Sequence, residues 1–237
     1  MQHLTRRRFL KTSAVLAGTP MFMNTSGVLG ANERLRVAVV GLNSRGKSHI
    51  GGYLGQKDVE VAALVDPDTK VLASRVADVG KRSGKEPAGY ADIRKLLEDR
   101  TIDAISIATP NHWHALMTIW GAQAGKHVYV EKPMSHDITE GRVAVAAQEK
   151  YGVVIQHGTQ RRSSSNEAGL AQAIKAGKFG KLKISYGYCC KPRKGIGHNK
   201  IAQSPANLDW DLWRGPADIG EYHGNYVHYD WHWFWAT

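Results

Sequence analysis

Eight residues near the start of the chain, 41–48, could hold the phosphates of a nucleotide in two different ways. They read GLNSRGKS and satisfy the phosphate-loop pattern G-x-x-x-x-G-K-[ST], in which the lysine reaches the phosphates and the serine hydroxyl binds magnesium. The same glycines could instead open a dinucleotide site, where backbone N–H groups at a helix start approach a pyrophosphate. The first site would hydrolyse a nucleoside triphosphate, whereas the second would serve hydride transfer.

Asp66 favours the dinucleotide site. It ends a short apolar run, 59–65, and follows Gly46 by about 20 residues, which is the offset of the acidic residue that accepts hydrogen bonds from the adenosine ribose at the end of a second strand. A carboxylate there repels a 2′-phosphate, so NAD is the predicted cofactor, although Arg45 and Lys47 leave NADP open.

Asn43 departs from the usual dinucleotide pattern, because it stands where the middle glycine is normally found. Asparagine tolerates a left-handed backbone better than most residues with a side chain, so the turn is predicted to form. On this interpretation only the backbone of the position matters, and Asn43→Gly is expected to preserve or improve NAD binding.

Strand-like and helix-like segments alternate along residues 33–158. Apolar, β-branched runs are each followed by a segment with helical spacing or a helix stop signal. Strands are predicted at 34–41, 59–66, 90, 102–109, 127–133 and 153–158, and helices at 47–54, 68–84, 91–100, 112–125 and 137–152. This order predicts an α/β fold, a Rossmann domain with a doubly wound parallel sheet and right-handed crossovers.

Residues 159–237 are predicted to begin a second α/β domain with an open, mostly antiparallel sheet. A helical pattern at 164–180 precedes two strand-like runs, at 181–191 and 225–235. The last run alternates, with Trp231, Trp233 and Trp235 on one face. An edge that exposes three such side chains is a liability for a monomer, so the chain is expected to be a truncated product or a fragment.

The N-terminus, 1–31, is predicted to be a twin-arginine export signal. The stretch TRRRFLK at 5–11 has paired arginines followed by an apolar residue, and a short, weakly apolar run comes next. The protein is therefore expected to meet the twin-arginine export machinery and to be periplasmic, or anchored in the membrane if the signal stays uncleaved. The other positive charges of the net +11 form no continuous stripe with aromatic residues, which argues against nucleic-acid binding.

Four motifs in order resemble one known family. The stretches VVGLNSRGKSH, LVDPD, ATPNHWH and VYVEKPMSHDITEGR are similar to those of the glucose-fructose oxidoreductase, inositol dehydrogenase and rhizopine-catabolism family, written Gfo/Idh/MocA, and EKP is the most specific of them. The later LDWDLWRGPA and NYVHYDWHWFW resemble exported members. The resemblance implies NAD(P)-dependent redox chemistry on a sugar, a cyclitol or a related polyol, in a protein expected to be a homo-oligomer when full length.

The resemblance also implies roles for single positions. Asp66 would lie at the adenosine ribose, His114 would fix the helix that follows it, and Glu131 and Lys132 would reach the nicotinamide ribose and the reacting hydroxyl. The pyrophosphate turn would be lined by Gly41, Asn43, Arg45 and Gly46, and the nicotinamide half would lie beside Thr109, Pro110 and Asn111.

Lys132 is the one candidate catalytic residue. Oxidation of a secondary alcohol needs the hydroxyl proton removed while nicotinamide accepts the hydride, and Lys132 could supply a cation or relay that proton. The acid/base histidine of the family, in a motif of the type D-x-G-x-H-x-x-D, should follow residue 235, but the chain ends at Thr237. Catalysis is therefore expected to be impaired, and the alternatives are a noncatalytic dinucleotide-binding fragment, a glycoside-cleaving relative that oxidises its substrate transiently, and an NTPase.

Two further groups of residues could be functional. His228 and His232 share a strand face in the predicted run but lie too far apart for one ion, so no metal site is predicted. Arg161 and Arg162 could face a substrate or lie on the surface. The adjacent Cys189 and Cys190 are expected to be small buried residues, because a disulfide between neighbours is strained.

Overall fold

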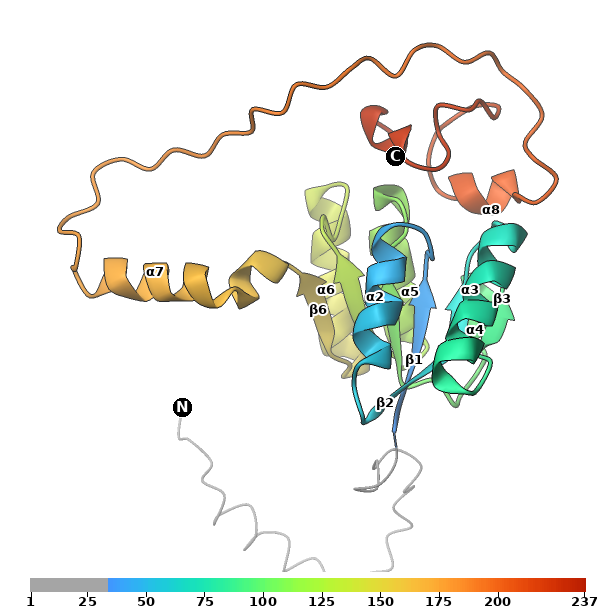
Figure 1. Cartoon of the computed structure of the whole chain (residues 1–237), viewed down its shortest axis with the longest axis horizontal. Coiled ribbons are helices and arrows are strands. Elements are labelled where there is room, and N and C mark those ends of the chain that lie inside the picture. The colour runs from blue at the N-terminus through green and yellow to red at the C-terminus, as the bar shows by residue number, and fades with distance from the viewer. Residues whose placement is uncertain (1–33) are drawn as a thin grey trace, which may run out of the picture. The chain divides into compact units, whose positions relative to one another are not determined.

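The computed structural model describes residues 34–237, and the predicted export signal lies outside them. Helices and strands alternate as far as residue 158 and are followed by helices, turns and extended segments (Figure 1). None of the helices within 34–237 is both long and apolar enough to cross a membrane.

Six parallel strands form one sheet in the order β3-β2-β1-β4-β5-β6. The order runs outward in both directions from β1 and β4, so the predicted doubly wound sheet is confirmed, with a crevice expected between these two strands at their carboxyl ends. The strands are β1 (Leu35–Val40), β2 (Val59–Val65), β3 (Ala88–Tyr90), β4 (Ala104–Ile107), β5 (His127–Glu131) and β6 (Ile155–Gly158).

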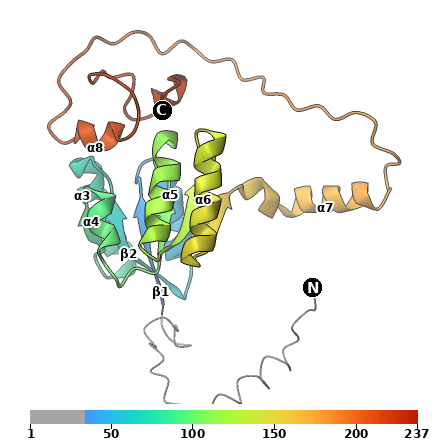
Figure 2. The same ribbon diagram turned by 180° about the vertical axis from the view of Figure 1, so that it is seen from behind.

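Helices cover both faces of the sheet, because its central strands are apolar on both sides. On one face α2 (Arg45–Leu54) and α3 (Thr69–Ser83) pack on β1 and β2 through a cluster that includes Ile50 and Val79 (Figure 1). The other face carries α4 (Ile93–Leu97), α5 (His114–Gln123) and α6 (Ile138–Tyr151) (Figure 2).

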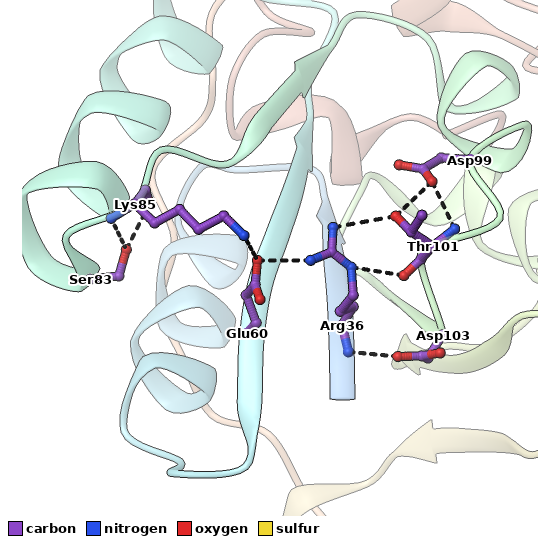
Figure 3. Close-up of polar contacts among 7 residues, drawn as sticks. All are labelled: Arg36, Glu60, Ser83, Lys85, Asp99, Thr101 and Asp103. Carbon is purple, nitrogen blue, oxygen red and sulfur yellow. Dashed lines mark hydrogen bonds and ion pairs between the residues drawn. The ribbon is translucent and has the colours of Figure 1, made fainter. Parts of the chain in front are cut away.

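The amino ends of the strands are held together by polar side chains (Figure 3). Arg36 on β1 donates to Glu60 on β2 at 3.0 Å and to the carbonyl oxygen of Thr101, before β4, at 2.9 Å. Lys85 donates to the same Glu60 carboxylate at 2.7 Å. The hydrogen bond from Lys85, helped by the charge of Arg36, outweighs burial and holds the pKa of Glu60 below its usual value.

The chain beyond Gly158 differs from the prediction. The helical pattern forms α7 (Ser165–Lys175), but 181–191 is neither helix nor strand and the side chains of Ile184 and Tyr186 are exposed. The predicted strand is wrong there because no other strand among the described residues pairs with it, and unpaired backbone groups leave a strand without its ladder. Cys189 and Cys190, expected to be buried, are exposed and free.

The aromatic run at 225–235 is also not a strand. It forms turns and the short 3₁₀ helix η4 (Asp230–Trp233), and it folds back on α8 (Trp210–Arg214). The rings of Trp210 and Trp213 stack with centroids 5.2 Å apart, and partly buried Trp231 packs on the same cluster. The aromatic side chains of this run therefore pack against neighbouring rings and do not show the predicted alternation between two faces of a strand. Trp235 stays exposed.

Candidate functional site

A cavity of about 450 Å³ opens at the carboxyl ends of the central strands. Ten of the eleven positions that the sequence singled out contribute to its lining, and Gly46 lies directly behind it, against Gly41. The ten residues are Gly41, Asn43, Arg45, Asp66, Thr109, Pro110, Asn111, His114, Glu131 and Lys132. The fold therefore brings together residues that are 91 positions apart in sequence, at the place where doubly wound sheets bind ligands.

The turn between β1 and α2 requires two glycines. Gly41 has φ of 80°, and a Cβ on Gly46 would lie 1.8 Å from the carbonyl oxygen of Gly41. The positive φ that the sequence suggested for Asn43 falls instead on Ser44, at 40°. The tolerance of asparagine for left-handed backbone is therefore not what keeps Asn43 at its position.

The start of α2 fits a bound pyrophosphate. Ser44 precedes the helix and its side chain caps no backbone N–H group, so the positive end of the helix is open to an anion. The hydroxyl of Thr109, which lines the cavity, is buried and has no hydrogen-bond partner among residues 34–237. A buried polar atom without a partner favours a ligand at that point.

Asp66 directly follows β2 and lines the cavity, the position from which doubly wound folds bind a ribose, and it also braces the glycine turn. The residue is 8% exposed, and its carboxylate accepts hydrogen bonds at 2.9 Å from the backbone N–H groups of Leu42 and Asp68. Burial raises the pKa of Asp66, although these two hydrogen bonds oppose the shift. Each carboxylate oxygen can accept a second hydrogen bond, which leaves capacity for ribose hydroxyls.

Glu131 ends β5 and collects four hydrogen bonds. One carboxylate oxygen accepts from Arg45 Nε at 2.6 Å, from His49 Nε2 at 3.0 Å and from the Gln160 amide. The other accepts from the backbone N–H of Lys132 at 3.2 Å. Burial would raise the pKa of Glu131, but the hydrogen bonds from Arg45 and His49 outweigh it, so its pKa lies below the usual value. Glu131 is therefore an ionised brace that fixes the backbone before the exposed Lys132 side chain.

Sequence reasoning missed His49 and Gln160. His49 is buried on α2, and its Nδ1 lies 2.9 Å from the Ser106 hydroxyl while Nε2 donates to Glu131. Burial lowers the pKa of His49 in spite of that carboxylate, so the ring is a neutral link between β4 and β5. The spacing from Arg45, four positions on one helix, places both side chains on the same face and could have identified His49.

His114 joins two loops at the edge of the cavity. Its Nδ1 lies 2.5 Å from the carbonyl oxygen of Pro133 and its Nε2 lies 2.9 Å from that of Thr109. Burial lowers the pKa of His114, although these carbonyl groups oppose the shift. The expectation that His114 fixes the start of α5 stays a prediction, and the loops it contacts are consistent with it.

Other candidates lie away from the cavity. Arg161 and Arg162 are exposed on the 3₁₀ helix η3 (Gln160–Ser163) and do not line it. Within the described part of the chain, no three histidine, cysteine or carboxylate side chains gather as metal ligands. The cavity also has a wall from the C-terminal part of the chain, formed by residues of the stretches LDWDLWRGPA and NYVHYDWHWFW, for which no role in the site was predicted from the sequence.

The profile of one protein family, described as an oxidoreductase family with an NAD-binding Rossmann fold and written GFO_IDH_MocA, matches residues 35–159. The chain belongs to the Gfo/Idh/MocA oxidoreductase family. The predicted fold and NAD as the predicted cofactor of this domain are thereby confirmed.

Relatives of the Gfo/Idh/MocA chain include dehydrogenases and a glycosidase. It is 31% identical over 164 residues to an alpha-N-acetylgalactosaminidase of Shewanella oneidensis, covering 59% of this chain and 36% of that protein. Among solved structures it resembles myo-inositol 2-dehydrogenase of Lactobacillus plantarum, with TM-score 0.58, 25% identity and coverage of 63% and 43% of the two chains.

A second solved structure contains a cofactor. It is the WlbA dehydrogenase of Bordetella pertussis in complex with NADH and UDP-GlcNAcA, with TM-score 0.57, 28% identity and coverage of 62% of this chain and 44% of that one. The match to the glycosidase spans about a third of that protein's length, and the matches to the dehydrogenases span less than half of theirs.

Proposed function

We propose that this chain supplies the cofactor-binding part of an oxidoreductase that moves hydride between NAD and a hydroxyl-bearing carbon of a sugar, a cyclitol or a related polyol. The convergence of ten sequence-selected residues on one cavity at the β1–β4 crevice carries the proposal. The names of the similar structures, an inositol dehydrogenase and a dehydrogenase crystallised with a nucleotide sugar, support the substrate class.

Each residue of the cavity has a role that follows from its functional group. Bound NAD supplies the hydride acceptor. The N–H groups that begin α2 and the guanidinium of Arg45 attract the pyrophosphate, and Asp66 accepts from the adenosine ribose. Glu131 fixes the backbone N–H of Lys132 at 3.2 Å, which orients the chain so that Lys132 can act on the substrate hydroxyl in one of two ways. As an ammonium it polarises the hydroxyl oxygen, and as a neutral amine it takes up the hydroxyl proton while the hydride leaves the carbon.

Glycoside cleavage through transient oxidation is the second candidate function. It uses the same cofactor and the same Lys132, and the similarity to an alpha-N-acetylgalactosaminidase favours it. Assays of one purified preparation with free sugars, inositols and aryl N-acetylgalactosaminides in the presence of NAD distinguish the two. Product release from the aryl glycoside without net NADH supports cleavage, whereas NADH formation from a free polyol supports dehydrogenation.

Nucleotide titration tests the assignment of the cavity. We expect NAD to bind more tightly than NADP, and Mg-ATP to bind weakly, when heat of binding is measured for the purified chain. Tight Mg-ATP binding without a response to NAD would restore the phosphate-loop interpretation of residues 41–48 and overturn the proposal. NAD binding without turnover of any tested sugar would favour the noncatalytic alternative.

A matched pair of substitutions on α2 sharpens this titration. Gly46→Ala places a Cβ 1.8 Å from the Gly41 carbonyl oxygen, whereas Gly52→Ala, on the same helix, meets no atom within 4 Å. We expect Gly46→Ala to abolish measurable NAD binding, and Gly52→Ala to keep it and to raise stability by about 0.5–1 kcal/mol. Equal NAD affinities for the two variants would contradict the role of the turn.

The route of export stays a proposal based on residues 5–11. The paired arginines support delivery of the folded, cofactor-loaded chain by the twin-arginine machinery. Fractionation of cells that produce the full chain tests it, and wholly cytoplasmic folded protein would contradict it.

A further inference from the structure

Residues 207–231, here called the C-terminal wall, close one side of the cavity. They lie outside the stretch 35–159 that the family profile matches, and α8 lies within them (Figure 1). The cavity-lining residues of the wall are Leu212, Trp213, His228, Tyr229 and Trp231.

The C-terminal wall is bound to the corner between β2 and α3. The N–H of Thr69 donates to the carbonyl oxygen of Asn207 at 2.8 Å, and the N–H of Asp209 donates to that of Pro67 at 3.1 Å. The Asn207 side-chain amide donates to the Asp68 carboxylate, also at 2.8 Å. These contacts involve the three residues that follow Asp66, so the wall stands beside the residue assigned to the adenosine ribose.

The wall is also bound to the corner between β4 and α5. His112 Nε2 lies 3.1 Å from the carbonyl oxygen of Trp213, and Trp113 Nε1 donates to the same oxygen at 3.0 Å. Gly215 packs against the Trp113 ring, since a Cβ there would meet it at 2.1 Å. The wall thus spans both corners that flank the crevice between β1 and β4.

His228 makes the contact between the wall and the glycine turn. Its Nδ1 lies 3.1 Å from the Asn43 side-chain amide nitrogen, and its Nε2 lies 3.4 Å from the Asp68 carboxylate. One neutral tautomer satisfies both contacts, with Nδ1 accepting from Asn43 and Nε2–H donating to Asp68. The side chain of His228 is about half exposed and lines the cavity, so the bridge lies at its mouth.

We propose that the C-terminal wall is part of the dinucleotide site, and that His228 is a positioning residue that holds the wall to Asn43 at the adenosine and pyrophosphate end. The proposal rests on the assignment of the cavity to NAD. Closing this end removes the bound adenosine part from water and orders the turn before binding, and a preorganised site binds more tightly. Asn43 then serves through its side chain, so Asn43→Gly weakens NAD binding, contrary to the expectation from the sequence.

Affinities for NAD and for ADP-ribose, which lacks the nicotinamide, show whether a substitution weakens binding of the adenosine and pyrophosphate part that the two ligands share. We expect His228→Ala to weaken both ligands by the same factor, about tenfold, as for the loss of about one hydrogen bond. Asn43→Ala should give a similar loss, and the double variant should bind no more weakly than the weaker single variant, because His228→Ala already breaks the contact that Asn43→Ala removes. His228→Gln, which retains a donor and an acceptor, should recover part of the affinity.

His198→Ala is the matched control, because His198 is exposed and does not line the cavity. If His228→Ala bound both ligands as tightly as the parent chain, the proposed role of His228 would be overturned. The assignment of the cavity to NAD would stand, because the parent chain would still bind NAD. Additive losses in the double variant, or a loss for NAD alone, would also overturn the proposed role of His228. Failure of the parent chain to bind NAD would instead refute the assignment of the cavity, and with it the proposed function.

Discussion

The two ends of the parallel sheet use charged side chains in different ways. At the amino end, Arg36, Glu60 and Lys85 satisfy one another across β1, β2 and the loop before β3 (Figure 3). At the carboxyl end, Glu131 is also fully engaged, but its partner Arg45 and its neighbour Lys132 line a cavity. The amino-end charges contact each other, Thr101 and solvent, whereas the carboxyl-end charges face a space that a ligand can fill.

The difference follows from backbone direction. In a parallel sheet every strand leads into a helix at its carboxyl end, so helix N-termini and loop side chains converge there, and the positive ends of the helix dipoles point the same way. At the amino end helices finish and loops are short. An ion-pair network at that end can only hold strands together, while a similar network at the other end can also position a cofactor.

The largest expected effect comes from removing the carboxylate charge of Glu131 at the carboxyl end, and removal of the Glu60 charge at the amino end is its control. Glu131→Gln leaves Arg45 and His49 without their anion, and we expect a loss of about 2 kcal/mol in the free energy of unfolding and at least tenfold weaker NAD binding. Glu60→Gln should cost less than about 1 kcal/mol and leave NAD affinity unchanged, because the Glu60 side chain is 23% exposed against 6% for Glu131 and Glu60 lies far from the cavity. Urea unfolding measures the stability of both variants, and calorimetric titration measures their NAD affinity. If both variants lost NAD affinity to a similar extent, the two ends of the sheet would not differ in function.

As the pH is lowered, stability contributed by the carboxyl end of the sheet should be lost before stability contributed by the amino end. Burial lowers the pKa of His112 to about 4, from 6.5, so between these values the unfolded chain binds a proton that the folded chain does not. Stability contributed by neutral His112 is complete above pH 6.5 and falls as the pH drops toward 4, by about 2 kcal/mol at pH 5. The pKa of Glu60 is lowered, so its contribution is lost only below about pH 4.5.

His112→Asn should therefore flatten the fall in stability between pH 6.5 and 4.5, measured by urea unfolding at several pH values. Glu60→Gln is the control and should leave the slope in that range as it is in the parent chain. An unchanged slope for His112→Asn would show that acid acts elsewhere, for example through His49 or His114, whose pKa values burial also lowers.

The smallest effect is expected from Lys85→Ala at the amino end. The Lys85 side chain is 68% exposed, so its bond to Glu60 should contribute less than about 1 kcal/mol and should disappear in about 1 M salt. Thermal unfolding at low and high salt measures it. If Lys85→Ala still lowered stability in high salt, the aliphatic part of Lys85 would contribute through packing in addition to the ion pair with Glu60. The two ends of the sheet would then differ less than the structure suggests.

The sequence predicted the first domain well because its signals are local and repeated. The central strands are apolar runs, helices such as α3 carry cap residues at both ends, Asp68 and Gly84, and parallel strands must bring their carboxyl ends to one edge. Residues that follow strands, such as Asp66, Thr109 and Glu131, therefore had to meet. The prediction failed at 181–191 and 225–235, where alternation indicates a strand only if another strand is present to pair with it.

The amino-acid sequence by itself determined the six-stranded sheet, the glycine turn and the group of residues that gather at its carboxyl edge, because periodicity and strand direction are properties of the chain. Tertiary structure alone decided which side chains contact each other there. The contact of His228 with Asn43, 185 positions earlier, and the three side-chain donors on Glu131 depend on how separate segments pack. No local pattern encodes such packing, so GLNSRGKS acquires its partners only in the folded protein.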